Sequence, residues 1–286
     1  MAVTCNGTIP CIVEGYGARL YYIPYEYGTI IGPEQWWRDY DKNWFYLFVT
    51  GYWSVTIVIA AAYVIGVHGL QRLMLNRKAW DLRWLHLIWN ACFALFSLVG
   101  FIRMSEEILF LLRTRPLLDS ISYAWDPHQP AAFWALCCIT SKFFALADTV
   151  FIVLRKRPLV FLHWYHHASV LIASWHSAKE MVACTRWFIL INFGVASITY
   201  AYFAAKLVGI RRRRIVSMAV TILEIAQMIA GVLISCFVLH YKLQGHVMQQ
   251  SYENLAIFFT FYVTFGILFT VFFKDAYIVN NDKKNR

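Results

Sequence analysis

The stretch Ile215–Leu239 reads IVSMAVTILEIAQMIAGVLISCFVL, and it contains one charged side chain in 25 residues. It follows a run of four arginines, residues 211–214. A helix needs about 20 mostly apolar residues to cross the hydrocarbon core of a bilayer, which is about 30 Å thick. The stretch is therefore typical of a membrane-spanning helix.

The whole composition agrees with this interpretation. Of the 286 residues, 60% are hydrophobic and 15% are charged, whereas soluble proteins average roughly 45–50% apolar residues. Lipid cannot satisfy free backbone groups, so segments that cross it form helices. Six further stretches qualify: Trp44–Gly66, Leu85–Ile102, Ala131–Leu154, Leu159–Trp175, Cys184–Ala205 and Leu255–Phe273. The sequence predicts an all-α membrane protein with seven transmembrane helices.

The charges predict how this helical domain, residues 44–273, lies in the membrane. The net charge is +10. It divides into +13 on the loops and tail of one side, −2 on the N-terminal segment and the other loops, and −1 within the spans. Because basic residues accumulate on the cytoplasmic side, we expect a lumenal segment 1–43 and a cytosolic tail 274–286. In this apolar chain the excess of basic residues indicates a membrane surface and not nucleic acid.

Short motifs fall on the sides that the charges assign to them. The first 43 residues hold no apolar signal-peptide core, so we expect the first span to direct insertion. Asn6 begins an Asn-Gly-Thr sequon for glycosylation, which requires the lumenal side. The tail ends in Lys-Lys-Asn-Arg, which resembles a dilysine signal for retrieval to the endoplasmic reticulum; a solvated basic tail is the alternative.

The seven cysteines form no zinc-binding pattern and no regular disulfide framework. Cys5, Cys11 and Cys184 fall on the lumenal side of the expected topology, where the oxidising environment allows a disulfide. The sequence leaves their connectivity open.

The most reactive cluster is His163-Trp164-Tyr165-His166-His167, near the expected cytosolic end of the fourth span. The spacing i, i+3, i+4 places the three imidazoles on one face of a helix. Exposing all three to lipid would be costly, so we expect them to line a cavity. Imidazole serves as a metal ligand or as a nucleophile or base near neutral pH.

Two kinds of chemistry remain open for this cluster. In the first, the three histidines bind zinc or iron with Asp148 as a further ligand; the other six histidines are scattered singly, without the further boxes of a di-iron oxygenase. In the second, one imidazole accepts an acyl group from a thioester while another imidazole or Asp148 orients it. Alternatively, Asp148 has no chemical role and only forms an ion pair with Lys142.

Basic residues flank the expected cytosolic ends of the spans. Arginine and lysine bind the phosphates of a carrier such as coenzyme A, although ordinary charge flanking of spans also accounts for these runs. The candidates for phosphate binding are Arg155, Lys156, Arg211 and Arg212.

From about Gly32 to the C-terminus, the chain resembles the very-long-chain fatty acid elongases, which are seven-span condensing enzymes of the endoplasmic reticulum. The most specific stretch runs from Lys142 through Asp148-Thr149 to the HxxHH box. Trp-Tyr within the box is similar to the branch that elongates saturated and monounsaturated acyl chains.

The resemblance implies condensation of acyl-CoA with malonyl-CoA to 3-oxoacyl-CoA, without a metal or redox cofactor. It implies that His166 carries the acyl group, that His163 and His167 support it, and that the acyl tail occupies a tunnel closed toward the lumen. It also suggests substrate contacts for Lys142 and for Asn192, Tyr200 and Tyr202 of the fifth span. Other enzymes of the elongation cycle and a second copy of the chain are the expected protein partners.

Three positions depart from the family pattern. The glutamate of its KxxExxDT segment is Ala145, and the histidine of its fifth-span motif is Ala196. The usual pair of glutamines in the sixth span appears as Glu224 and Gln227. Loss of a general base typically costs about 10²–10⁴-fold in rate. The alternative to an active elongase is therefore a weak or inactive paralogue that binds acyl-CoA or regulates other components.

A seven-span receptor or transporter would share the predicted topology. A transporter commonly contains two repeated halves, and this chain shows no internal repeat. Three histidines gathered on one cytosol-facing helix are not expected of either class. An elongase therefore accounts for more of the sequence.

Overall fold

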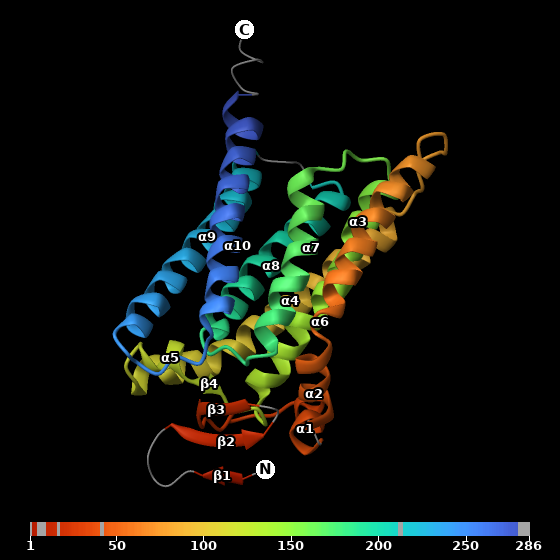
Figure 1. Ribbon diagram of the computed structural model, residues 1–286. Coiled ribbons are helices and arrows are strands. Elements are labelled where there is room, and N and C mark those ends of the chain that lie inside the picture. Colours follow the sequence, from red (N-terminus) through yellow and green to blue (C-terminus); the bar gives the residue numbers. More distant parts are fainter. Residues whose placement is uncertain (1, 5–9, 16–17, 41–42, 211–213, 280–286) are drawn as a thin grey trace.

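The computed structural model describes residues 2–4, 10–15, 18–40, 43–210 and 214–279. It is mostly helical, with a small sheet packed at one end of a helical bundle (Figure 1). The short helices are α1 (Gly32–Asp39), α2 (Asn43–Tyr52) and α5 (Asp119–Ser122). The long helices are α3 (Val55–Leu73), α4 (Arg83–Thr114), α6 (Pro130–Leu154), α7 (Phe161–Ala178), α8 (Thr185–Leu207), α9 (Arg214–Leu243) and α10 (Tyr252–Phe273), with a π-helical turn at Lys274–Val279.

The sheet corrects the prediction that the protein is entirely α-helical. It contains β1 (Ala2–Thr4), β2 (Cys11–Gly15), β3 (Ala18–Ile23) and β4 (Ala124–Trp125) in that order. β1, β2 and β3 pair antiparallel, and β4 joins β3 in parallel from the loop between α5 and α6. The run Leu-Tyr-Tyr-Ile in β3 is rich in residues that favour strands, a signal that counting apolar spans overlooks.

Six of the helices are long and apolar enough to cross a membrane, within the part of the chain that the structure describes. They are α3, α4, α6, α8, α9 and α10 with its π-helical turn. α7 forms where the fourth span was predicted, but it is not among the six. Its histidines and other polar residues lower its hydropathy, so the prediction of seven spans is not confirmed by this criterion.

Two predicted spans have different boundaries in the structure. The first is divided between α2 and α3, with a break at Trp53 and Ser54. The Trp53 ring packs edge-on against His176 and lies under the ammonium of Lys179, at 4.7 Å in both cases, so contacts with α7 fix the chain at the break. α4 continues beyond the predicted Ile102 to Thr114, because charged residues in its second half are paired inside the protein.

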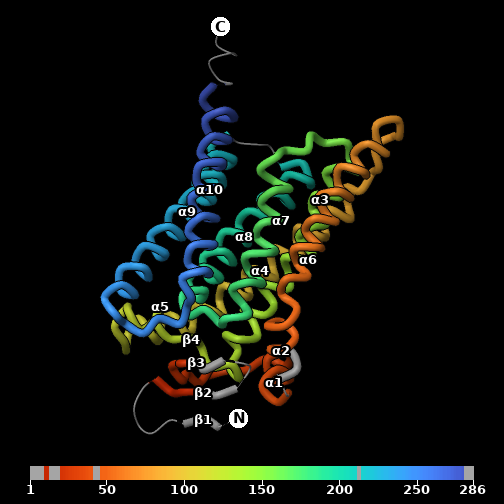
Figure 2. The backbone as a smooth tube through the Cα atoms, viewed as in Figure 1, coloured from red at the N-terminus to blue at the C-terminus, as the bar shows by residue number. Residues whose placement is uncertain are grey.

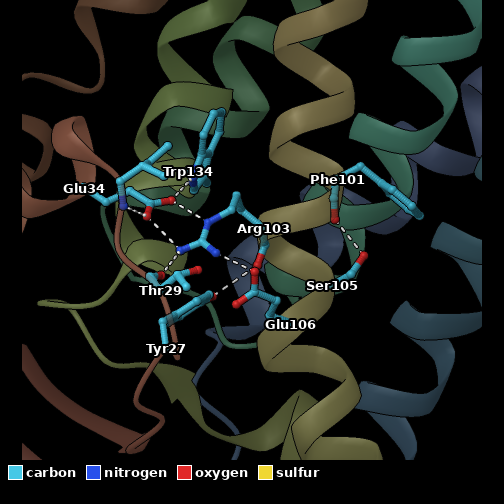
Figure 3. A network of polar contacts seen from close by, with 9 residues as sticks. Tyr27, Thr29, Glu34, Phe101, Arg103, Ser105, Glu106 and Trp134 are labelled. Carbon is cyan, nitrogen blue, oxygen red and sulfur yellow. Dashed lines mark hydrogen bonds and ion pairs between the residues drawn. The ribbon is translucent and has the colours of Figure 1, made fainter.

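One such pairing attaches the N-terminal segment to the bundle (Figure 3). Glu34 of α1 accepts hydrogen bonds from Arg103 Nε and Nη2, both at 2.7 Å, and from Trp134 Nε1 at 2.7 Å. Arg103 also donates to the Thr29 carbonyl at 2.8 Å and pairs with Glu106. Burial opposes the charge of Glu34, but hydrogen bonds from Arg103, Trp134 and the backbone outweigh it and hold the pKa of Glu34 below its ordinary 4.5. This cluster joins α1, α4 and α6.

The tube in Figure 2 shows the two ends of the bundle clearly. The sheet and α1 lie at one end, here called the sheet end. α7 begins and α10 finishes at the other, here called the box end. The predicted chemistry therefore lies away from the sheet, in the half of the bundle nearer the box end.

Candidate active site

The three histidines of α7 lie on one face, as their spacing predicts. The ring centroids of His163 and His167 are 4.5 Å apart, and those of His166 and His167 are 5.8 Å apart. α7 begins at Phe161, directly after the loop that contains Pro158. The box therefore occupies the first two turns of the helix.

His166 faces aromatic residues of α10. Its ring lies 5.0 Å from Phe265, 6.0 Å from Phe261 and 6.1 Å from Phe269, measured between centroids. No residue in the described part of the chain hydrogen-bonds to either of its ring nitrogens. His166 thus lies among aromatic rings, and its ring nitrogens are unengaged, as nucleophilic attack requires.

Asp148 of α6 is held by two hydrogen bonds and lies close to His167. It accepts from Trp89 Nε1 at 2.6 Å and from the Tyr200 hydroxyl at 2.6 Å. Its Oδ2 lies 3.9 Å from His167 Nε2, which is beyond hydrogen-bond length but close enough for ionic attraction when His167 is protonated. Asp148 is therefore placed to act on His167, whose ring lies between those of His163 and His166.

Lys142 hydrogen-bonds to Asn192, and no ion pair between Lys142 and Asp148 is seen among the described residues. Its ammonium donates to Asn192 Oδ1 of α8 at 2.6 Å. Lys142 and Asn192 line the same cavity as His166. The predicted substrate-binding pair therefore lies beside the predicted nucleophile, and the bond joins α6 to α8.

The cavity lies among α6, α7, α8 and α10, and it changes character along its length. Lys142, His166 and Asn192 line it in the half nearer the box end. Beyond them its walls are mostly apolar, and the lining extends to residues of α2, of β4 and of the loop after α7 at the sheet end. These further lining residues include Ala135, Ile139, Val170, Ala173, Ile189, Tyr46, Trp125 and Met181. The shape fits a molecule with a reactive head and an apolar tail.

Several predicted site residues lie elsewhere. The Tyr202 hydroxyl hydrogen-bonds to Ser217 at the start of α9, away from Asp148. Arg155 Nη1 lies 3.0 Å from His86 Nδ1, and Lys156 Nζ donates to the Leu75 carbonyl at 2.9 Å. Arg211, Arg212 and Asn6 lie outside the described residues.

The two alanines that depart from the family pattern lie on helices that face each other across the site. Ala196 is one turn from both Asn192 and Tyr200 on α8, and these two residues bond to Lys142 and Asp148 of α6. Ala145 lies buried between Lys142 and Asp148 in sequence. Two of the eight described polar atoms that are buried without a hydrogen-bond partner, His163 Nε2 and Thr199 Oγ1, belong to α7 and α8.

Two residues around the site were missed by the sequence analysis. Trp89 of α4 donates to Asp148, and the Tyr63 hydroxyl of α3 bonds to Thr149 Oγ1 at 2.5 Å. Buried tryptophan and tyrosine usually find a hydrogen-bond partner. Both residues lie within predicted spans, and this was an available signal, although it could not identify their partners.

The structure does not provide a set of metal ligands around the histidine box among the described residues. Across the described residues, no group of three or more His, Cys, Asp and Glu side chains is arranged to hold a metal ion. Asp148 approaches His167, whereas His166 faces α10. The donor geometry therefore favours acid-base and nucleophilic roles for the box.

Known proteins are similar in sequence to this chain over most of its length. Residues 48–285 match the model of the ELO family, described as the GNS1/SUR4 family. Very long chain fatty acid elongase 6 of Drosophila melanogaster is 37% identical over 82% of this chain and 75% of its own length. The human proteins named very long chain fatty acid elongase 6 and elongase 3 are 32% and 34% identical, over 84% and 81% of this chain and 91% and 86% of their own lengths.

Together, the histidine box, the lysine and aspartate of α6 and these relatives lead to one conclusion. The chain belongs to the ELO family of fatty acid elongases, and it is a multi-pass membrane protein.

Proposed function

We propose that the protein condenses an acyl-CoA with malonyl-CoA, forming a 3-oxoacyl-CoA two carbons longer and releasing carbon dioxide and CoA. One observation carries the proposal: His166 lines a largely apolar cavity together with Lys142 and Asn192. An acyl tail fits the apolar length, and its thioester then lies near the imidazole.

In the first half-reaction, a nitrogen of His166 attacks the thioester carbonyl of acyl-CoA. The new bond joins nitrogen to the acyl carbon, the carbon–sulfur bond breaks, and CoA leaves with the electron pair of that bond. The imidazole proton passes to the departing sulfur. His167, with Asp148 beside it at 3.9 Å, is placed to stabilise positive charge in the box during this step.

In the second half-reaction, malonyl-CoA loses carbon dioxide, and the electron pair of the broken bond remains on its C2 carbon. That carbon attacks the acyl carbonyl on His166. The nitrogen–carbon bond breaks with its electron pair remaining on nitrogen, and the imidazole takes up one proton from the solvent. The products are 3-oxoacyl-CoA and free His166. Lys142, fixed by Asn192, is positioned to bind an anionic carboxylate or carbonyl oxygen near the box. The chemistry as written uses no metal and no redox cofactor.

The proposed acyl substrate is saturated, monounsaturated or branched. Trp164 and Tyr165 within the box support this choice. The chain is about equally similar to human elongases 6 and 3, so overall identity does not select a substrate class. The proposed substrate class therefore rests on the two residues within the histidine box. We assign CoA phosphate binding to Arg155 and Lys156 at the box end. For Arg211 and Arg212, which lie outside the described residues, the same role is proposed from the sequence alone.

We further propose seven spans, with the N-terminus in the lumen of the endoplasmic reticulum and the C-terminus in the cytosol. α7 has 18 residues and therefore extends about 27 Å, close to the core thickness of a bilayer. The sheet and the end of α10 lie at opposite ends of the bundle (Figure 1), as an odd number of spans requires. Cys11 is disulfide-bonded, which suits a lumenal sheet end.

A second candidate is a paralogue with weak or no turnover, and Ala196 is the observation that favours it. The residue lies one turn from both Asn192 and Tyr200, where a histidine would extend toward α6. His163 Nε2 and Thr199 Oγ1 are among the described buried polar atoms that lack a hydrogen-bond partner. This candidate explains the family membership without requiring catalysis.

Product analysis separates the two candidates. Membranes carrying wild type or Ala196→His are incubated with malonyl-CoA and acyl-CoAs of graded length, and 3-oxoacyl products are measured by mass spectrometry. An active elongase gives wild-type product that His166→Ala abolishes. Product from Ala196→His alone supports the weak paralogue, and wild-type turnover that survives His166→Ala contradicts the proposed mechanism.

A further inference from the structure

A groove opens on the outer face of the bundle between α4 and α6, beside the cavity that contains His166. Its walls are mostly apolar. They come from Trp89, Cys92, Phe93 and Phe96 of α4 and from Leu136, Cys137, Thr140, Ser141 and Phe144 of α6. The outermost side chain, Phe144, is 58% exposed, and Cys92 is also exposed. In a chain with six candidate membrane spans, such a face meets the hydrocarbon of the bilayer.

The groove and the cavity share a wall. Leu136 lines both of them. Cys137 and Ser141 line the groove, while their neighbours Cys138 and Lys142 line the cavity. One face of α6 therefore bounds the cavity, and the adjacent face bounds the groove.

Contacts hold α4 and α6 together on both sides of the groove. Toward the box end, Trp89 Nε1 donates to Asp148 at 2.6 Å. Toward the sheet end, the Phe96 ring packs 5.8 Å from Trp134, and Trp134 and Arg103 both bond to Glu34 (Figure 3). α4 and α6 are thus held together on the box side and on the sheet side of the groove. Between these contacts, no hydrogen bond joins the two helices among the described residues.

The side chains with nitrogen or oxygen atoms in this lining are Trp89, Thr140 and Ser141. The Ser141 hydroxyl donates to the Cys138 carbonyl at 2.6 Å, and the Trp89 N–H is already engaged by Asp148. The remaining surface consists of aromatic rings, methyl-bearing side chains and thiols. An acyl chain is the molecule in the bilayer that such a surface fits.

We propose that this groove is a lateral portal through which the acyl chain of acyl-CoA moves between the bilayer and the cavity. The inference rests on the proposed function for the identity of the cargo. A long acyl-CoA keeps its tail in the membrane and its head at the surface. Entry along the seam lets the tail reach the cavity without crossing water, which is costly for every methylene exposed.

Photo-crosslinking in the wild-type protein tests the portal without relying on catalysis. Protein in phosphatidylcholine nanodiscs is incubated with a long-chain acyl-CoA that carries a diazirine in its chain, then irradiated, and adducts are mapped by mass spectrometry. The portal predicts adducts on Cys92, Phe93 and Phe144, which line the groove and not the cavity, and excess unlabelled acyl-CoA should suppress them. Cys236, an exposed residue of α9 that lines neither the groove nor the cavity, reports the lipid background, which unlabelled acyl-CoA does not suppress. Absence of suppressible adducts in the groove overturns the portal.

A kinetic comparison provides a second test. Cys92→Trp fills the groove from α4, and Cys236→Trp adds the same ring to an exposed site elsewhere. Long-chain elongation should fall about tenfold in Cys92→Trp, equivalent to about 1.4 kcal/mol of barrier, and remain unchanged in Cys236→Trp. Equal rates in the two folded variants overturn the portal. If wild type yields no 3-oxoacyl-CoA, the proposed function fails, and the crosslinking result still decides whether acyl chains enter the groove.

Discussion

Replacing Glu34 with glutamine should loosen the attachment of the N-terminal segment to the bundle. The Glu34 side chain is fully buried, and that of Arg103 is 7% exposed. Removing one partner of a buried ion pair typically costs about 3–5 kcal/mol, because the other charge stays buried. Arg103 keeps Glu106 and the Thr29 carbonyl, so we expect a loss near the lower limit, about 3 kcal/mol.

This loss should appear as a lower melting temperature. At roughly 2–4 °C per kcal/mol for a chain of this size, Glu34→Gln should melt about 6–12 °C below wild type. The assay is thermal unfolding in detergent, followed by the reaction of a thiol-sensitive dye with the buried free cysteines Cys138 and Cys184. Glu26→Gln is the matched control, because Glu26 is an exposed glutamate in the same N-terminal region.

A double-mutant cycle tests whether the ion pair is the cause. Glu34→Gln combined with Arg103→Gln should destabilise less than the two single changes added together, since the second substitution removes the stranded charge. The structural reasoning is refuted if Glu34→Gln has the same melting temperature as Glu26→Gln. It is also refuted if the losses of stability from Glu34→Gln and Arg103→Gln simply add in the double mutant.

Three other predictions concern pH, the site and the cavity. Since the pKa of Glu34 lies below its ordinary 4.5 in the folded protein, its stabilisation is complete above 4.5 and is lost as the pH falls through the folded value; melting curves should show this acid loss in wild type and not in Glu34→Gln. Asp148→Asn should lower kcat about 10²-fold or more with little change in KM, measured as 3-oxoacyl-CoA formation, and unchanged kcat would remove Asp148 from the mechanism. Ala178→Phe narrows the cavity toward the sheet end, so the longest product should shorten by at least one two-carbon step, and an unchanged product length would show that the tail does not reach Ala178.

Much of the helical framework could be predicted from the sequence, because long apolar runs have few alternatives in a membrane chain. The box shows the same principle locally: helical spacing alone indicates that His163, His166 and His167 share a face, and the structure confirms it. The strands β1, β2 and β3 are close in sequence and were missed because only apolar spans were counted. The pairing of β3 with β4 crosses about a hundred residues, and no local pattern carries information about it.

The partners within the site depended on packing between helices. Asp148 was assigned as an orienter, but its approach to His167 and its bond from Trp89 follow from how α4 and α7 pack against α6. Tyr202 and Tyr200 look alike in the motif, yet they are two residues apart on a helix and point to different neighbours. Spacing therefore identifies faces, and only tertiary structure identifies contacts.

The central claim is that His166 carries the acyl group. Purified protein is incubated with acyl-CoA in the absence of malonyl-CoA, quenched, and examined by intact-protein and peptide mass spectrometry. The mechanism predicts an added acyl mass on His166, release of one CoA per modified protein, and loss of the adduct when malonyl-CoA is supplied. An acyl group found on another residue, or elongation by His166→Ala at the wild-type rate, would contradict it.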